Sequence, residues 1–204
     1  MRRQAATCAI ALFAAWSAGG FQKGRERMTL FEQIPVEVRD YLTAGDGLAK
    51  ASVKERYPNV QQTLASHECR AAVLRYLESD EPWKQPNVGF LINALAYLQA
   101  AANAKEAPVA LKLAGYPNAW VRVRADEYLM GVYYPAGDRA SMVKMYERML
   151  NDSDEVVRVQ AARWIKGTNA AAEMRGYLQD WISRAAERHW DHQESFTLVQ
   201  EALH

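Results

Sequence analysis

The chain has 204 residues, of which 50% are hydrophobic and 24% are charged, so it can form one domain or one short array with a buried core. Its formal net charge of +1 gives no bulk attraction to nucleic acid or to an anionic membrane. Alanine is abundant while isoleucine and threonine are scarce, and this balance favours helix over strand.

Residues 1–20 have the pattern of a short secretory signal peptide. Two arginines precede a largely apolar run over residues 5–18, and two glycines follow it. This interpretation places the mature protein in the periplasm or outside the cell. Met28 offers a second start, in which case the leader is not translated and the protein is cytoplasmic. In either case the folded domain is predicted to span residues 29–204.

The mature chain shows no sequence pattern of a membrane span or of a disulfide framework. No apolar run reaches the length that crosses a bilayer. Outside the leader, Cys69 is the only cysteine, so the fold must be stabilised by packing. Cys69 lies in a helical pattern and is predicted to be a small buried side chain.

Proline and glycine divide the chain at the spacing of helical hairpins. The first part is predicted to hold a helix over residues 29–44 that Pro35 breaks, a short helix over 48–56 and a longer helix over 59–78. Asn59 is the expected cap of that third helix. A polar, proline-rich turn over residues 79–86 follows it.

The rest of the chain is predicted to be helical throughout, since no strand-like alternation occurs. The expected helices are 87–102, then the pairs 105–116 with 119–134, 139–150 with 155–166, and 170–188 with 192–203. Residues 135–138 form the clearest loop between two pairs. In the last pair, Asp191 and Glu194 have the spacing of a capping box.

The sequence repeats itself within these helices. Residues 117–129 match residues 86–98, thirty-one positions earlier, at Pro, Asn, Ala, Tyr and Leu. Residues 154–165, thirty-six positions later, share the Val-Arg-Val core and an alanine. A period of this length indicates a stack of supersecondary units.

Equivalent positions of the repeat have a physical interpretation. A strong N-cap residue precedes each second helix, a small residue lets helices approach closely, and an aromatic residue seals the contact between units. These positions hold Asn87, Asn118 and Asp154; then Ala94, Ala125 and Ala161; then Tyr97, Tyr128 and Trp164.

This pattern resembles the HEAT repeat family, whose second helix follows an Asp-containing turn and carries Val-Arg-x-x-Ala. Residues 154–161 match it closely, and residues 118–125 match it with Asn118 in place of the acid. The copy at residues 87–98 has Phe-Leu where Val-Arg should stand. The resemblance is strongest over residues 105–167. It implies an all-α, right-handed α-solenoid of about four HEAT-like helical hairpins behind an N-terminal helical cap, and no particular activity.

Basic residues of the second helices suggest a binding surface. In HEAT-like stacks these helices line the concave face, so the arginines and lysine there predict a basic ridge suited to an acidic protein or a phosphate backbone. The resemblance implies that Arg122 and Arg158 are structural and bridge repeats. Arg124, Arg163 and Lys166 remain as candidate binding residues.

Aromatic residues suggest a second surface. Tyr133 and Tyr134 end one second helix, and Trp83 lies in a turn. Tyrosine and tryptophan are typical anchors at protein interfaces. They also cap hydrophobic cores at repeat edges, and both interpretations stay open.

The best candidate for a metal site is the pair His189 and His192, with Asp191 and Glu194 beside them. The two acids already have predicted capping roles, and the histidines would need one continuous helix to share a face. We therefore expect no metal. The chain has no GxSxG, HExxH, P-loop, GxGxxG or CxxC motif, so we expect neither a cofactor nor catalysis.

The sequence thus predicts a non-catalytic scaffold or adaptor that binds another protein through the concave face. It would act in the bacterial envelope if residues 1–20 are a signal peptide, and an immunity protein that neutralises a toxin is one such role. The alternative is a cytoplasmic, nucleic-acid-binding HEAT-like protein that starts near Met28. The near-zero net charge argues against that alternative.

Overall fold

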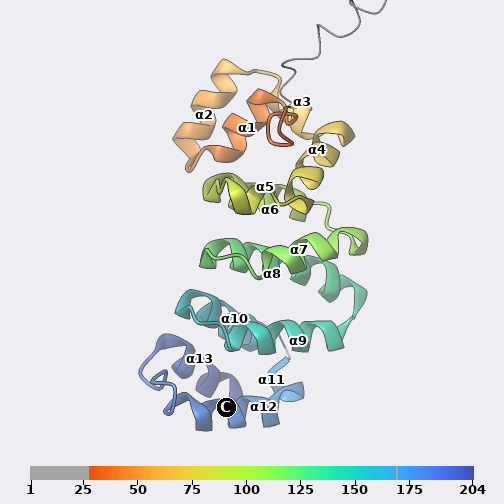
Figure 1. Ribbon diagram of the computed structural model, residues 1–204. Coiled ribbons are helices and arrows are strands. Elements are labelled where there is room, and N and C mark those ends of the chain that lie inside the picture. Colours follow the sequence, from red (N-terminus) through yellow and green to blue (C-terminus); the bar gives the residue numbers. More distant parts are fainter. Residues whose placement is uncertain (1–27, 169) are drawn as a thin grey trace, which may run out of the picture.

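The computed structural model describes residues 28–168 and 170–204. These residues form thirteen α-helices and one short 3-10 helix, without any strand. The predicted signal peptide, residues 1–20, lies outside them. Figure 1 shows the helices in successive layers that follow the chain from its N-terminal to its C-terminal end. The all-α class predicted from the sequence is confirmed.

The N-terminal part holds α1 (Val36–Thr43), α2 (Gly47–Arg56), α3 (Val60–Leu64), α4 (His67–Glu78) and α5 (Glu81–Lys84). The single helix predicted over residues 59–78 is wrong, because two helices stand there. The Ser66 side chain accepts a hydrogen bond from the Cys69 amide at 3.1 Å and thereby starts α4. Asn59 makes no side-chain capping bond to α3.

Two other boundaries in this part differ from the prediction. The first helix begins only after Pro35, which precedes α1 as its N-cap residue. The turn predicted over residues 79–86 contains α5, with Pro82 in its first turn, where the missing amide proton is tolerated.

The remaining elements are α6 (Val88–Gln99), η1 (Ala104–Glu106), α7 (Ala107–Leu113), α8 (Ala119–Ala136), α9 (Arg139–Leu150), α10 (Glu155–Gly167), α11 (Ala170–Glu173), α12 (Arg175–Ala185) and α13 (Glu194–Leu203). The loop predicted over residues 135–138 is shorter than expected, because α8 continues through Pro135. The helix stops at Gly137, whose φ of 65° is the left-handed conformation that glycine adopts easily. The helix predicted over residues 170–188 is divided at Met174 into α11 and α12.

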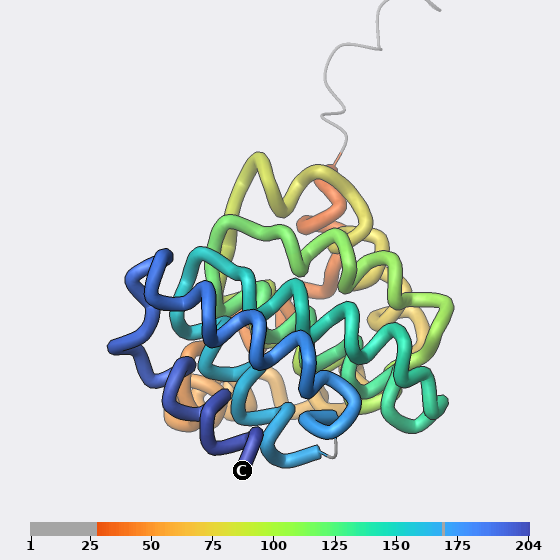
Figure 2. Tube along the Cα trace, turned by 90° about the horizontal axis from the view of Figure 1, so that it is seen from below, coloured from red at the N-terminus to blue at the C-terminus, as the bar shows by residue number. Residues whose placement is uncertain are grey.

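The second helices of successive layers pack directly on one another. α6 contacts α8, α8 contacts α10, and α10 contacts α13, while α7, α9 and α12 pack on the second helix of their own layer. Figure 2 views the molecule from its C-terminal end and shows the layers lying one behind another. Among the described helices the first helices of successive layers contact one another more sparsely than the second helices do.

The equivalent small residues lie inside this stack, whereas the aromatic residues differ: Tyr128 is buried, and Tyr97 and Trp164 are partly buried against the core. Ala94, Ala125 and Ala161 are fully buried, which allows neighbouring second helices to approach closely. The Tyr97 hydroxyl donates to the Leu64 carbonyl at 2.6 Å. Tyr128 is likewise buried and belongs to the same continuous core. Within residues 28–168 and 170–204, no helix has the length and apolar character needed to cross a membrane.

Candidate binding face

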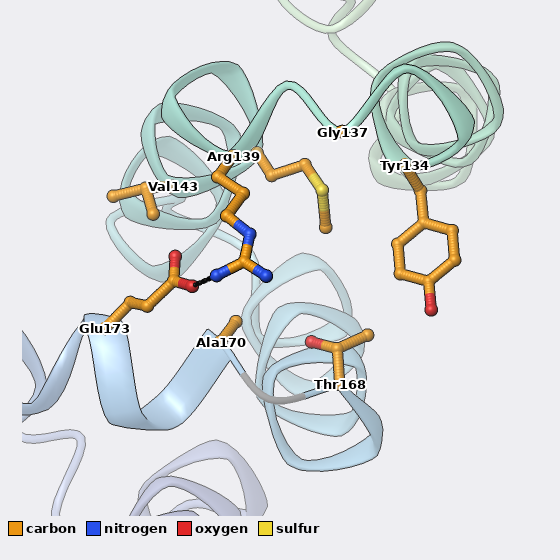
Figure 3. A pocket seen from close by; sticks show the side chains of 8 residues that line it. Tyr134, Gly137, Arg139, Val143, Thr168, Ala170 and Glu173 are labelled. Atoms are coloured by element: carbon orange, nitrogen blue, oxygen red, sulfur yellow. Dashed lines mark hydrogen bonds and ion pairs between the residues drawn. The ribbon is translucent and has the colours of Figure 1, made fainter.

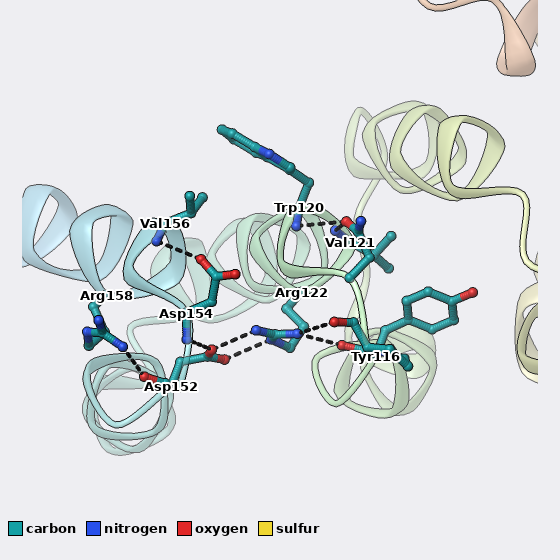
Figure 4. Close-up of polar contacts among 10 residues, drawn as sticks. Tyr116, Trp120, Val121, Arg122, Asp152, Asp154, Val156 and Arg158 are labelled. Atoms are coloured by element: carbon teal, nitrogen blue, oxygen red, sulfur yellow. Dashed lines mark hydrogen bonds and ion pairs between the residues drawn. The ribbon is translucent and has the colours of Figure 1, made fainter.

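Side-chain caps fix where three of the second helices begin. In each case an Asn or Asp oxygen accepts a hydrogen bond from an amide of the first turn, which would otherwise lack a partner. The pairs are Asn87 with Phe90 at 3.0 Å, Asn118 with Trp120 at 3.0 Å, and Asp154 with Val156 at 3.0 Å. Figure 4 shows the pair of Asp154 with Val156.

The last second helix begins differently from the prediction. α13 starts at Glu194, its N-cap residue is Gln193, and no side chain caps it. The predicted capping box of Asp191 with Glu194 is therefore wrong. The Glu194 amide instead donates to Oε1 of Glu155 at 2.9 Å. A carboxylate of the preceding layer thus takes the place of a local cap.

Arg122 connects two layers. Its guanidinium pairs with both carboxylate oxygens of Asp152, at 2.8 and 2.6 Å (Figure 4). The same group donates to the carbonyls of Tyr116 and Pro117, at 2.8 and 2.9 Å. Its side chain is 11% exposed, so these contacts consume the hydrogen-bonding capacity that a partner could have used.

Arg158 makes the equivalent connection one layer later and is almost completely buried. It donates to the Asp152 carbonyl and to Oε1 of Gln193, both at 2.5 Å, and lies 4.2 Å over the ring of Trp190. Burial lowers the pKa of Arg158, and the acidic residues nearby, Glu155 foremost, oppose that shift. Arg158 is therefore enclosed by the structure, like Arg122.

The three basic residues left as binding candidates all lie on the outer side of the second helices. Each of them forms an ion pair with an acidic residue: Arg124 with Glu127, Arg163 with Glu194 at 2.7 Å, and Lys166 with Glu201 at 2.7 Å. The surface predicted as a basic ridge is thus a row of paired charges. The acidic partners in α13 lie more than thirty positions away along the chain, so only the stacking of layers brings them there.

The two tyrosines at the end of α8 have different environments. Tyr133 is half-buried and packs against the core, and burial raises the pKa of its hydroxyl. Tyr134 is 62% exposed and lines a hollow of about 390 Å³. An ion pair between Arg139 and Glu173 crosses this hollow, as Figure 3 shows. Trp83 packs against Tyr116 in a tilted arrangement, with ring centres 4.8 Å apart.

Trp120 is the functional candidate that sequence reasoning missed. Its side chain is 55% exposed, which makes it the most exposed tryptophan among the described residues. It lines a hollow of about 350 Å³ together with residues of α10 and the first residue of α13: Glu155, Val156, Val159, Gln160, Arg163 and Glu194. Helical spacing could have indicated its position, because Val121, Ala125 and Leu129 occupy the buried side of α8.

A second hollow, of about 320 Å³, lies further along α8 and is lined by Gln99, Arg124, Glu127, Met130 and Trp164. Both hollows are lined by residues of α8 and α10. We define the second-helix face by the residues that line these hollows, together with the pair Lys166 and Glu201.

The candidate metal residues lie between α12 and α13, so no continuous helix joins them. His189 has a φ of 56°, in the left-handed region, and Nδ1 of His192 lies 3.7 Å from the Asp191 carboxylate. In the part of the chain that the structure describes, no group of three or more His, Cys, Asp or Glu residues is placed to hold a metal ion.

Comparisons with protein-family models, with curated proteins and with solved structures found no match for this chain.

Proposed function

We propose that the protein is a non-catalytic scaffold or adaptor that binds another protein through the second-helix face. The observation that carries this proposal is Trp120, an exposed tryptophan beside a hollow with two valines in its wall. Large aromatic side chains of this kind supply much of the free energy at protein interfaces. The paired charges around it match the polar rim of such interfaces.

The proposed architecture is a right-handed α-solenoid of about four HEAT-like hairpins behind a helical N-terminal cap. Close contacts along the row of second helices, and sparser ones among first helices, support a stack that bends toward the second helices. Arg122 and Arg158 each donate to a carbonyl six positions earlier, which supports a repeated unit. The second-helix face would then be the concave face.

A protein partner fits this face better than nucleic acid does. Binding to a phosphate backbone depends on lysine and arginine side chains that neutralise phosphates. Here Arg124, Arg163 and Lys166 are already neutralised by acidic neighbours. A catalytic role has no support from the hollows, since neither unites a nucleophile with a base.

Site-specific photocrosslinking tests this function. A benzoylphenylalanine placed at Gln160, on the second-helix face, should give a discrete protein adduct in the native host. The adduct should disappear when Trp120→Ala is added. The same group at Leu111, an exposed residue of α7, is the matched control and should give no such adduct. Equal labelling from both positions would overturn the proposal, and so would salt-dependent binding of the purified protein to duplex DNA.

We also propose that the protein works outside the cytoplasm. The intact mass of the native protein in each cell fraction tests this. A chain beginning at Ala18 or Phe21 in the extracytoplasmic fraction is expected, whereas a cytoplasmic chain beginning at Met28 would contradict it.

A further inference from the structure

The hollow beside Trp120 has an excess of negative charge. Its ionisable lining residues are Glu155, Glu194 and Arg163. Arg163 pairs with Glu194 at 2.7 Å, so these two charges cancel. Within the described part of the chain, Glu155 forms no ion pair, and only its Oε1 is engaged, by the Glu194 amide. Arg158 attracts Glu155 electrostatically over a longer distance, and it attracts Asp152 and Asp154 in the same way.

The remaining lining is apolar and aromatic. The indole of Trp120 extends from α8 toward Val156, as Figure 4 shows. Val156 and Val159 supply aliphatic surface to the same hollow. An aromatic face, aliphatic walls and a carboxylate without an ion-pair partner together favour a cationic side chain, and arginine above all. The guanidinium of arginine is a planar cation that stacks on indole and pairs with carboxylates, while its methylene stem packs on apolar groups.

The chain itself contains such a pairing one layer further along. Trp190 has the guanidinium of Arg158 4.2 Å from its ring centre and that of Arg188 at 5.0 Å. Trp120, by contrast, has no cation over its ring among residues 28–168 and 170–204. Trp120 is therefore free to receive an arginine from outside.

We propose that the Trp120 hollow binds one arginine side chain of the partner protein; this inference rests on the function proposed above. The guanidinium stacks on Trp120 and pairs with Glu155. An acidic group of the partner would be repelled by Glu155. A purely apolar side chain would cover that carboxylate and leave it without a partner, which is unfavourable.

The probe is N-acetyl-arginine methylamide, and the isosteric, uncharged control is N-acetyl-citrulline methylamide. Each is titrated into the ¹⁵N-labelled protein to tens of millimolar while the Trp120 indole resonance is followed, assigned from the spectrum of Trp120→Phe. The arginine probe should produce a saturable shift there and at the amides of Val156 and Val159. The citrulline probe should not. No saturable shift, or equal shifts with both probes, would overturn the inference.

Substitutions test which side chains contribute to binding of the arginine probe. Trp120→Ala should abolish saturable binding, while Leu111→Ala, which alters another exposed apolar side chain, should leave it unchanged. Glu155→Gln should weaken the arginine probe about fivefold, as expected for the loss of one exposed ion pair. Glu187→Gln, which removes an exposed glutamate elsewhere, should not weaken it. A Glu155→Gln protein that binds as tightly as the wild type would remove Glu155 from the site.

The two proposals fail in different ways. If the photocrosslink at Gln160 forms but the arginine probe leaves Trp120 unchanged, the arginine site is wrong and the binding function stands. If neither occurs, both are wrong. Well-dispersed spectra of Trp120→Ala would show that a loss of binding does not come from a loss of fold.

Discussion

We call a contact in which an arginine connects two successive layers a junction. The junctions differ in the group that pairs with the arginine side chain. In the first part of the stack that group is an acid, whereas near the C-terminus it is neutral. The pairs are Arg70 with Glu106 at 2.5 Å, Arg122 with Asp152 at 2.6 Å, and Arg158 with the amide oxygen of Gln193 at 2.5 Å. Among the described residues Arg158 has no acid within ion-pair distance, and the ring of Trp190 lies against it instead.

Arginine can therefore connect two layers in two physically different ways. At Arg70 and Arg122, opposite charges and hydrogen bonds compensate the loss of hydration. At Arg158, two neutral acceptors and an aromatic face do so, and Nε of Arg158 is buried without a partner. We expect the acid-paired junctions to depend on charge and the last junction to depend more on packing.

The largest expected effect is the loss of charge at the Arg122 junction. Methionine preserves much of the stem's volume but removes the cation. Arg122→Met should lower the free energy of unfolding by about 3 kcal/mol, because it leaves Asp152 partly buried and unpaired. Arg158→Met should cost about 1 kcal/mol, because only neutral groups lose a partner. Urea unfolding followed by circular dichroism measures both.

A double-variant cycle sharpens this comparison. Arg122→Met combined with Asp152→Asn should cost less than the sum of the two single changes, since the second removes the charge that the first exposes. A larger loss for Arg158→Met than for Arg122→Met would contradict the distinction between the two kinds of junction.

The Arg70 junction should give the chain a pH-dependent stability. Burial raises the pKa of Glu106, but hydrogen bonds from Tyr128, Arg70 and Asn103 outweigh it, so the net pKa lies below the ordinary 4.5. The stability that this carboxylate contributes is present above the unfolded pKa and is lost as the pH falls through the folded pKa. Relative to Glu106→Gln, the wild type should be more stable by about 2 kcal/mol at neutral pH.

Unfolding midpoints of both proteins between pH 7 and pH 3 measure this advantage, which should stay constant down to about pH 5 and then shrink. Glu187→Gln, at an exposed position, is the control and should follow the wild type. An advantage that grows as the pH falls would show that the sign of the Glu106 shift is wrong.

The smallest expected effect concerns the helix caps. Asp154→Ala should lower the free energy of unfolding by about 1 kcal/mol, because it removes the acceptor for the Val156 amide. Asp191→Ala should change it by less than about 0.5 kcal/mol, because α13 begins three residues later without a side-chain cap. Thermal unfolding of the two variants measures the difference. Similar losses of unfolding free energy in the two variants would show that Asp191 does cap α13.

Capping residues in the sequence predicted the helix starts that depend only on neighbouring residues. Asn118 and Asp154 cap their helices because the acceptor and the amide are two positions apart. Asp191 had the same local signal. Asp191 does not cap α13, because the Glu194 amide donates to the carboxylate of Glu155, thirty-nine positions earlier in α10. A capping box predicts a helix start only where no tertiary partner competes.

The binding face could be predicted only in part, for the same reason. The sequence predicts Arg124, Arg163 and Lys166 as members of a basic ridge, because second helices line the concave face in HEAT-like stacks. Their neutralisation could not be foreseen, because the acids that pair with Arg163 and Lys166 come from another layer. The helical period places Trp120 away from the buried side of α8, but the hollow beside it depends on how α10 and α13 pack next to α8.

The sequence by itself determined the all-helical class and the caps at Asn87, Asn118 and Asp154, since these follow from interactions within a few residues. The stacking of layers decided which charges are paired and which helix begins without a cap. It also left Trp120 exposed beside the free carboxylate of Glu155. Those outcomes depend on residues far apart along the chain, and only their packing brings them within contact distance.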